Sequence, residues 1–389
     1  AAWIAENRDM VVLDSRTLEE FRRMSIPTGI SVPGGELAYR IAELAPNPDT
    51  LVVVNCAGRT RSILGAESLR QAGIPNRVVA LRNGTMGWEL AGLRCARGET
   101  AQFPPGPPAS AAVALERARD FAERSGVREL AVGELAAFLE DDTRTTYLLD
   151  VRDPEDAASE PLPGRLAPGG QLVQATDSWI GVRNARIALI DDDGARARMT
   201  AAWLRQMGHR DVFVLAAGTN ARELRAGPQH PIDQPDPMIP ATSPWVLQAL
   251  PDALVIDLAR SIDFRAGHIP GAIWGVRSRL EQLRPLLQGR REIVLTCPDG
   301  SLARRTVGEV QAMTDARVRY LRDGTAAWTR AGFPLDSSRT VPRDEDCVDF
   351  YLRPYDRNSG VEEAMNAYLS WEIDLVHEIE RDGTVRFGV

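Results

Sequence analysis

The sequence predicts an α/β protein of three tandem domains, each a small, mostly parallel sheet flanked by helices. Short apolar runs alternate with stretches of helical period, which is typical of βαβ units on a parallel sheet. One such pattern occurs three times in the 389 residues, and each copy spans about a hundred residues. The total length agrees with two to four domains, at the usual size of about 100–200 residues per domain.

Each copy begins with an apolar strand that ends in Asp. These strands end at Asp14, Asp150 and Asp257. A turn rich in Pro and Gly follows each strand. The turns are Pro33-Gly34-Gly35, Pro168-Gly169-Gly170 and His268-Ile269-Pro270-Gly271. The recurrence of both features in the same order indicates one fold used three times.

A second apolar strand follows about forty residues after each Asp and leads into a loop. The loop opens at Cys56 in the first copy, at Asp191-Asp192-Asp193 in the second and at Cys297 in the third. A helix comes next, and Gly73 and Gly208 are placed to end it in the first two copies.

A strand and turn of similar sequence close each copy. The closing blocks are Leu81-Arg82-Asn83-Gly84-Thr85, Leu215-Ala216-Ala217-Gly218-Thr219 and Leu321-Arg322-Asp323-Gly324-Thr325. The predicted boundaries are domains at 1–100, 123–227 and 238–337, a linker and helix at 101–122, a linker at 228–237, and an ordered C-terminal extension at 338–389. Because the chain starts without Met inside an apparent helix, we expect a further repeat upstream of Ala1.

Composition limits the classes of partner. The net charge of −8 disfavours nucleic acid, and neither a membrane span nor a signal peptide is visible. The four cysteines are far apart, which predicts neither a disulfide framework nor a metal cluster. We therefore expect no metal or other cofactor, and a reducing cytoplasmic location.

Cys56 is placed to be an activated nucleophile. It follows the apolar run Leu51–Val54, and a tight loop after a strand turns its backbone N–H groups inward as an anion-binding nest. The next helix adds the partial positive charge of its N-terminus. We therefore expect a depressed pKa for the Cys56 thiol, although a buried structural cysteine is the alternative. The residues expected around the sulfur are Ala57, Gly58, Arg59, Thr60, Arg61 and Ser62.

These motifs together resemble the rhodanese (thiosulfate sulfurtransferase) family. The resemblance rests on the strand with Asp-x-Arg, on Gly-His-Ile-Pro-Gly-Ala at Gly267–Ala272, on the Cys loop, and on Leu-Arg-Asn/Asp-Gly-Thr-x-x-Trp. It implies a double displacement, in which the loop cysteine takes sulfur from a donor as a persulfide and passes it to a thiol or cyanide. The same folds also serve as binding modules and phosphatases.

The first loop resembles the sulfur-transfer members. Cys56–Arg61 has the six-residue length of these members, whereas the phosphatase loop is one residue longer. Arg59 and Arg61 suit a dianionic donor, which makes thiosulfate the expected donor and a protein persulfide the alternative. Asp14 and Arg16 are expected either to contact this loop or to brace it.

The other two loops depart from that pattern. An Asp replaces the cysteine in the second copy, which predicts a catalytically inactive structural domain, or an acidic rim that docks a basic partner. Cys297 is a second candidate catalytic residue, but Asp299 should oppose its ionisation. The rival function for the whole chain is a binding or redox-sensing protein without turnover.

Overall fold

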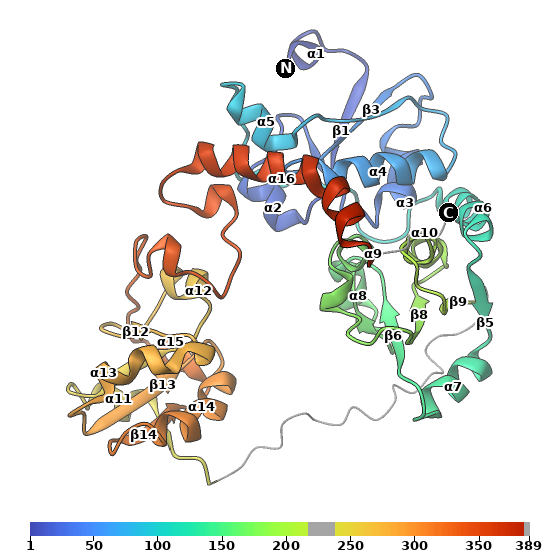
Figure 1. The fold of residues 1–389 in the computed structure, drawn as a ribbon. Coiled ribbons are helices and arrows are strands. Elements are labelled where there is room, and N and C mark those ends of the chain that lie inside the picture. The colour runs from blue at the N-terminus through green and yellow to red at the C-terminus, as the bar shows by residue number, and fades with distance from the viewer. Residues whose placement is uncertain (217–237, 385–389) are drawn as a thin grey trace. The chain divides into compact units, whose positions relative to one another are not determined.

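The computed structural model describes residues 1–216 and 238–384. The chain divides into two compact units, Ala1–His230 with Asn366–Val389, and Pro231–Met365, and each unit is described by itself (Figure 1). The predicted linker at 228–237 and residues 217–219 of the second closing block lie outside the described residues.

Three parallel sheets form the centres of the fold, two in the first unit and one in the second. The first has the order β2-β1-β3-β4, the second β5-β9-β8-β6-β7 and the third β10-β14-β13-β11-β12, and every described strand pair is parallel. The strands are β1 Met10–Asp14, β2 Ile30–Ser31, β3 Leu51–Asn55, β4 Val78–Ala80, β5 Arg128–Leu130, β6 Thr146–Asp150, β7 Arg165–Leu166, β8 Arg186–Ile190, β9 Val212–Leu215, β10 Ala241–Thr242, β11 Leu254–Asp257, β12 Ile273–Trp274, β13 Glu292–Thr296 and β14 Arg317–Leu321. All three sheets place the Asp-ending strand (β1, β6, β11) beside the strand that precedes the loop (β3, β8, β13).

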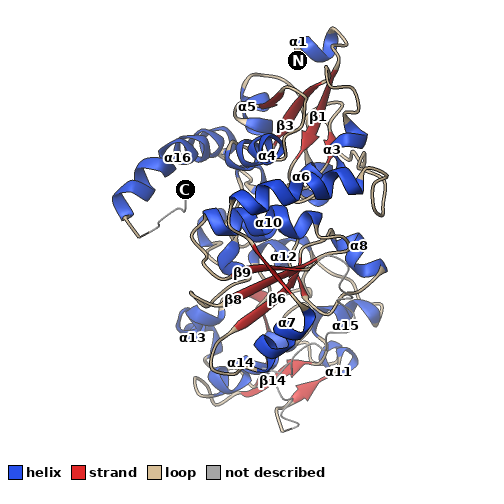
Figure 2. Ribbon diagram, turned by 90° about the vertical axis from the view of Figure 1, so that its right-hand side faces the viewer, coloured by secondary structure: helices blue, strands red, loops and turns tan. Residues whose placement is uncertain are grey.

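Helices cover these sheets (Figure 2). The α-helices are α1 Ala2–Ala5, α2 Leu18–Arg23, α3 Leu37–Leu44, α4 Thr60–Gln71, α5 Gly84–Leu90, α6 Ala111–Arg124, α7 Val132–Glu140, α8 Pro154–Ser159, α9 Gly169–Gln174, α10 Ala195–Gln206, α11 Pro244–Gln248, α12 Ser261–Ala266, α13 Arg284–Leu287, α14 Ser301–Gln311, α15 Gly324–Arg330 and α16 Val361–Asp382; short 3-10 turns lie at Thr176–Ser178, Arg277–Leu283, Asp344–Asp346 and Pro354–Asp356. No helix in the described part of the chain has the length and apolar character that a membrane span needs.

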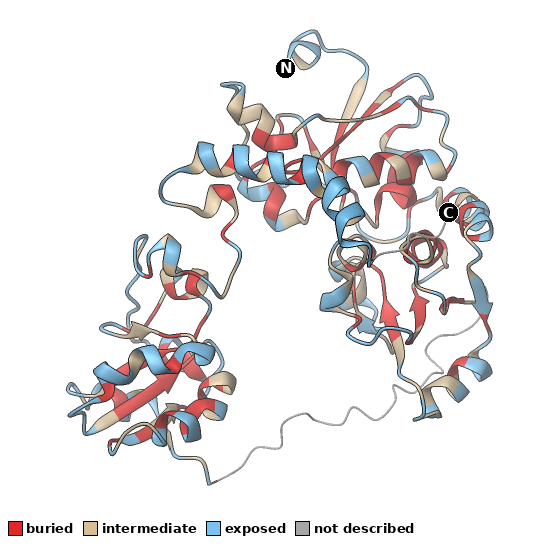
Figure 3. Ribbon diagram, viewed as in Figure 1, coloured by how far each residue is buried: buried red, intermediate tan, exposed pale blue. Residues whose placement is uncertain are grey.

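The middle strands are apolar because helices bury them on both faces. Val52 and Val54 of β3 are fully buried, as are Leu189 of β8 and Leu295 of β13 (Figure 3). Continuous apolar runs of this kind are typical of parallel sheets covered on two sides. Their carboxyl ends therefore remain as the places where polar loops emerge.

The predicted helix stops are confirmed. α4 ends at Gln71 and α10 at Gln206, and Gly73 and Gly208 take positive φ angles of 67° and 95°. Glycine adopts this backbone conformation without the steric cost of a side chain.

The helix predicted within 101–122 joins the first two copies. α6 buries Ala114, Ala118, Phe121 and Ala122 and packs against α3 of the first copy and α10 of the second. The two Pro-Gly-Gly turns also touch, since a Cβ built on Gly170 would stand 2.8 Å from the backbone nitrogen of Gly35. The first two sheets thus belong to one packed body.

Candidate active site

Cys56 lies at the carboxyl end of β3, directly before the loop that leads into α4. Asn55, the last residue of β3, pairs with Asp14 in β1, and α4 begins at Thr60. This is the predicted position. The Cys56 side chain is buried, however, with 1% of its surface exposed.

The closing block of the first copy fixes the Cys56 loop through backbone hydrogen bonds. The backbone carbonyls of Cys56 and Ala57 accept the N–H groups of Thr85 and Met86, both at 3.0 Å. Gly84 has φ 55°, and a Cβ there would stand 2.2 Å from the Cys56 carbonyl oxygen. The block therefore requires glycine at this point and fixes the path of the loop.

Asp14 and Arg16 form a buried ion pair below the loop. Arg16 Nε and Nη2 donate to the two carboxylate oxygens of Asp14, each at 2.8 Å, and the Asn55 amide donates to Asp14 at 2.8 Å. Arg16 and Asp14 are 0% and 1% exposed. This geometry favours a bracing role over contact with substrate.

The expectation of a depressed Cys56 pKa is wrong for this arrangement. Burial raises the pKa of the Cys56 thiol above its ordinary value, and it outweighs the lowering by the Ser62 hydroxyl, the Arg61 charge and the Ser62 backbone N–H. The carboxylate of Glu372 raises the Cys56 pKa further. The sequence motif supplies the stabilising groups, but desolvation of the sulfur opposes them.

The two arginines of the loop already have partners. Arg61 forms a two-point ion pair with Glu20, at 2.8 and 3.0 Å, and Glu20 is itself buried. Arg59 donates to the Asn83 side chain at 3.4 Å. The local positive charge inferred from the sequence is therefore partly balanced by Glu20.

Glu372, which sequence reasoning missed, contacts the loop from α16. Its Oε1 atom accepts the backbone N–H of Thr60 at 3.2 Å and the Thr60 hydroxyl at 2.8 Å. The aromatic residues of the extension indicated that it packs on the body, but no local pattern singled out this carboxylate among the acidic residues of the extension.

A cavity of about 350 Å³ lies beside the loop in the first unit. Thr60 and Arg61 line it from α4, and Trp371 from α16. Met199 and Trp203 of the second copy contribute apolar surface. Cys56, which is 1% exposed, is not among the residues that line this cavity.

In the second copy, the carboxylate of Asp191 stands where the first copy has the Cys56 sulfur. Strand register pairs Asp150 with Ile190 as it pairs Asp14 with Asn55, so Asp191 is the equivalent of Cys56. The Asp191 carboxylate accepts backbone N–H groups from three residues at 2.6–3.1 Å, namely Gly194, Arg196 and Ala197. This loop therefore binds an anion through its amides, as a nest does.

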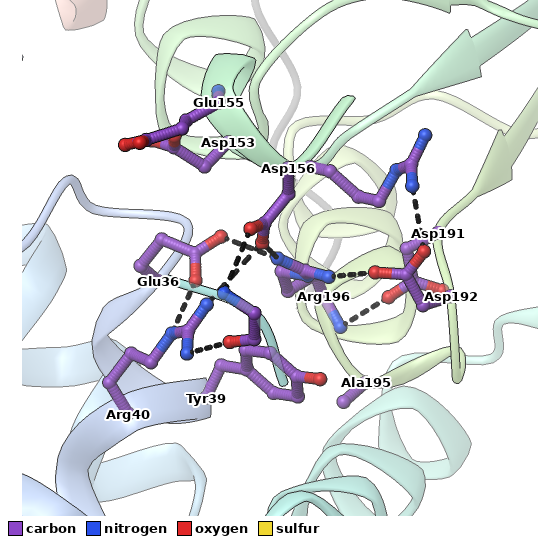
Figure 4. Close-up of polar contacts among 12 residues, drawn as sticks. Glu36, Tyr39, Arg40, Asp153, Glu155, Asp156, Asp191, Asp192, Ala195 and Arg196 are labelled. Atoms are coloured by element: carbon purple, nitrogen blue, oxygen red, sulfur yellow. Dashed lines mark hydrogen bonds and ion pairs between the residues drawn. The ribbon is translucent and has the colours of Figure 1, made fainter. Parts of the chain in front are cut away.

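The other two acidic side chains of that loop also form polar contacts, and Figure 4 shows Asp192 beside Arg196. Asp192 pairs with Arg196 at 2.6 Å and with Arg152 at 2.7 Å, and Asp193 accepts the Tyr39 hydroxyl at 2.7 Å. Arg196 reaches Glu36 of the first copy at 3.0 Å. Asp193 and Arg196 thus help to join the first two copies, and docking of a basic partner on the acidic rim stays a prediction.

The loop of the third copy holds Cys297 beside an acid, as expected. Cys297 is 2% exposed, and its Sγ lies 3.5 Å from Asp299 Oδ1. Burial raises the pKa of the Cys297 thiol, the backbone N–H groups of Ala303 and Leu302 lower it, and Asp299 raises it again. The predicted opposition of Asp299 to ionisation is confirmed.

The remaining cysteines lie outside these loops. Cys95 is half-buried, and its pKa is raised to about 12 by burial and by Glu89. Cys347 is buried near the Pro342 and Arg343 carbonyls. All four cysteines are free thiols, and the described residues contain no cluster of three or more side chains able to hold a metal ion.

Comparison with known proteins places these loops in a family. The family model of the Rhodanese-like domain matches residues 1–91 and 242–331. A sulfurtransferase from Allochromatium vinosum is 31% identical over 90 residues, which cover 23% of this chain and 81% of that protein. The crystal structure of a thiosulfate sulfurtransferase from Pseudomonas aeruginosa is 45% identical, with a TM-score of 0.91 over 100% of this chain and 74% of that chain. The segments matched by the family model contain Cys56 and Cys297.

Proposed function

This chain belongs to the rhodanese family, and we propose that it is a sulfurtransferase that carries sulfur as a persulfide on Cys56. The proposed donor is thiosulfate, with a protein persulfide as the alternative, and the acceptor is a thiol or cyanide. The sulfurtransferase of A. vinosum and the thiosulfate sulfurtransferase of P. aeruginosa support this reaction class.

The observation that carries the proposal is that backbone N–H groups of the second loop bind the Asp191 carboxylate, which stands at the position equivalent to Cys56. Asp191 accepts the amides of the residues five and six positions after it, Arg196 and Ala197. The residues at the same distances from Cys56 are Arg61 and Ser62, and the Ser62 amide acts on the Cys56 thiol. The first loop has the same design around a sulfur, which suits thiolate and persulfide anions.

The proposed reaction has two displacement steps. The Cys56 thiolate attacks the outer sulfur of thiosulfate, a Cys56 S–S bond forms, the S–S bond of thiosulfate breaks, and sulfite leaves with the bonding electron pair. An acceptor thiolate or cyanide then attacks the terminal sulfur, and Cys56 leaves as the thiolate. Arg59, Arg61 and the amides from Ala57 to Ser62 bind the anionic groups in both steps.

We also propose that all three copies are rhodanese-like domains with the boundaries 1–100, 123–227 and 238–337. The family model covers the first and third copies. The second has the strand order of the third and an equivalent loop at Asp191. It cannot form a persulfide, so its proposed role is structural. Residues 101–122, 228–237 and 338–389 are the proposed linkers and extension.

Cys297 is proposed not to use thiosulfate. Its loop has Asp299 two positions after the cysteine and Leu302 at the position of Arg61. A carboxylate 3.5 Å from the sulfur repels an anionic donor and opposes the thiolate. For the chain as a whole, four free thiols suit a reducing compartment such as the cytoplasm.

The test is thiosulfate-to-cyanide sulfur transfer on the full chain beside the matched variants Cys56→Ser and Cys297→Ser. Intact-mass measurement after incubation with thiosulfate detects a gain of one sulfur atom. We expect turnover and the sulfur adduct to disappear with Cys56→Ser and to persist with Cys297→Ser.

Two results would contradict the proposal. Equal activity in Cys56→Ser and the unmodified chain would place the chemistry elsewhere. No sulfur uptake by the unmodified chain from either thiosulfate or a low-molecular-weight persulfide would favour the binding or redox-sensing function. Hydrolysis of an aryl phosphate that depends on Cys56 would instead favour a phosphatase.

A further inference from the structure

A carboxylate caps the same helix position in all three copies. The residue four positions after Cys56, Asp191 or Cys297 is the first residue of the following helix, namely Thr60, Ala195 and Ser301. Its backbone N–H donates to Glu372 at 3.2 Å in the first copy, to Asp193 at 2.9 Å in the second and to Asp299 at 3.0 Å in the third. The N-terminus of a helix attracts such negative charge.

The source of the carboxylate differs in the first copy. Asp193 and Asp299 belong to their own loops, two positions after the central residue, where the first copy has Gly58. Glu372 is 312 positions from Thr60 in sequence and reaches it from α16. A Cβ on Gly58 would stand 2.1 Å from Glu372 Oε2, so the missing side chain of Gly58 provides the space for this carboxylate.

In that space, only one of the two Glu372 carboxylate oxygens accepts hydrogen bonds from the described residues. Glu372 is 7% exposed, and its Oε1 atom accepts both the N–H and the hydroxyl of Thr60. Its Oε2 atom is buried and has no hydrogen-bond partner among the described residues. A buried carboxylate oxygen without a partner costs free energy, which makes Glu372 easier to displace than Asp299, whose loop fixes it beside its helix.

Glu372 also closes the loop. Cys56 is 1% exposed, and Tyr368, one helical turn before Glu372, lies against Gly58, with its Cε1 atom 2.9 Å from the position of a Cβ. The negative charge of Glu372 adds to the burial that raises the Cys56 pKa. In this arrangement the sulfur is buried, and both its burial and the Glu372 charge favour the thiol over the thiolate.

We propose that Glu372 holds the place of the donor's anionic group at the N-terminus of α4 and thereby sets the affinity of the Cys56 site for anionic donors. The proposal rests on the proposed function of Cys56 as the sulfur carrier. An anionic donor replaces the carboxylate at Thr60, and the displacement of Glu372 uncovers the sulfur. In the third copy the equivalent carboxylate belongs to the loop, and this exchange is not available.

The test uses Glu372→Gln and Glu372→Ala in the full chain. Gln keeps the size of the side chain and an acceptor for Thr60 but removes the charge, whereas Ala removes both. Glu378→Gln, an exposed residue of the same helix, is the matched control. Iodoacetate and iodoacetamide are similar alkylating reagents that differ in charge, and peptide mass spectrometry gives the rate of each at Cys56 separately from the other cysteines.

We expect Glu372→Gln to raise the ratio of the iodoacetate rate to the iodoacetamide rate on the order of tenfold, because one nearby negative charge is removed. Glu372→Ala should raise the ratio at least as much and should lower the KM for thiosulfate several-fold, with a smaller change in kcat. Glu378→Gln should change neither quantity.

The outcomes separate this inference from the proposed function. An unchanged reagent ratio in both folded Glu372 variants overturns the inference, whatever the turnover. An equal acceleration of both reagents, confined to Glu372→Ala, also overturns it, because Glu372 would then be a cover without charge selection. A raised ratio in a chain that takes up no sulfur supports Glu372 as the occupant of the anion position and rejects sulfur transfer.

Discussion

Asp191 takes in the second copy the position that Cys56 takes in the first, and its carboxylate accepts three backbone N–H groups of its loop. Burial raises the pKa of Asp191 to about 6 despite these hydrogen bonds and the charge of Arg196. The same type of loop thus surrounds a carboxylic acid, Asp191, in the second copy and a thiol, Cys56, in the first. In the first copy, where the central acid is a thiol, the loop is held from outside by Thr85 and Glu372.

Gly84→Ala should displace the Cys56 loop. A side chain at φ 55° is strained by roughly 1–3 kcal/mol, and its Cβ would overlap the Cys56 carbonyl oxygen at 2.2 Å. We expect thiosulfate turnover to fall at least about tenfold. Gly324→Ala is the matched control, because it makes the same clash with Cys297. Equal loss of turnover in the two variants would show that the effect is not local to Cys56.

The reactivity of Cys56 should rise with pH beyond the ordinary range of a thiol. Because burial raises the pKa of Cys56 above its ordinary value, the rate of iodoacetamide alkylation in the folded chain should still increase at the pH where the unfolded chain reaches its plateau. In urea, the same peptide should show a plateau near the ordinary pKa of roughly 8.5. The folded state favours the thiol, so this group's contribution to stability is complete below that pKa and declines as pH rises above it. A plateau below neutral pH in the folded chain would contradict the prediction.

Arg196→Met should destabilise the first unit. Arg196 is 1% exposed and pairs with Glu36, Asp156 and Asp192, so its loss removes one of the cations of this cluster and leaves Arg40 and Arg152 as the remaining ones. Breaking a buried ion pair on one side costs roughly 3–5 kcal/mol. The loss of stability is measured by urea unfolding, monitored through hydrogen exchange of the β8 peptide. The exposed Arg183→Met is the control, and a loss of the same size there would refute the specific role of Arg196.

Asp257→Asn should stabilise the third sheet above pH 6. Ala259 stands where the first two copies have Arg16 and Arg152, so Asp257 lacks their ion pair and burial raises its pKa to about 6. The folded state therefore favours protonated Asp257. Stability from this group is complete below pH 4 and is lost between pH 4 and 6, by roughly 3 kcal/mol in full. Asn keeps an acceptor for the Ala259 N–H, now made at 2.9 Å.

The measurement for this variant is hydrogen exchange of the β13 peptide between about pH 4 and 7, with rates corrected for the intrinsic effect of pH. Protection should fall with rising pH in the unmodified chain and stay level in Asp257→Asn. Asp14→Asn should instead lower the protection of the first sheet, because it removes the carboxylate that pairs with buried Arg16. Parallel pH profiles in the unmodified chain and Asp257→Asn would contradict the assignment.

Much of the fold is readable from local sequence. Apolar runs such as Leu51–Val54 predict buried parallel strands, and Gly73 and Gly208 mark helix ends because their backbone angles favour glycine. The third copy departs from the Asp-x-Arg pattern, because Ala259 stands two positions after Asp257 and the next arginine is Arg260. It stands one position later than Arg16 does and pairs with exposed Asp263 instead. A one-residue shift after a strand changes which side of the chain a side chain leaves, and this moved Arg260 away from Asp257.

The sequence by itself determined the repeated succession of strands, loops and helices along the chain, the family and the position of Cys56 before a helix, because these follow from periodicity and from motifs of neighbouring residues. Only the tertiary structure decided how deeply the Cys56 sulfur is buried and which charges lie near it. Glu20 is 41 positions from Arg61 and Glu372 is 312 positions from Thr60, and no local pattern pairs residues so far apart. The charge of a site and the burial of its nucleophile depend on such distant side chains, since electrostatic energy follows distance in space and exposure to water rather than order along the chain.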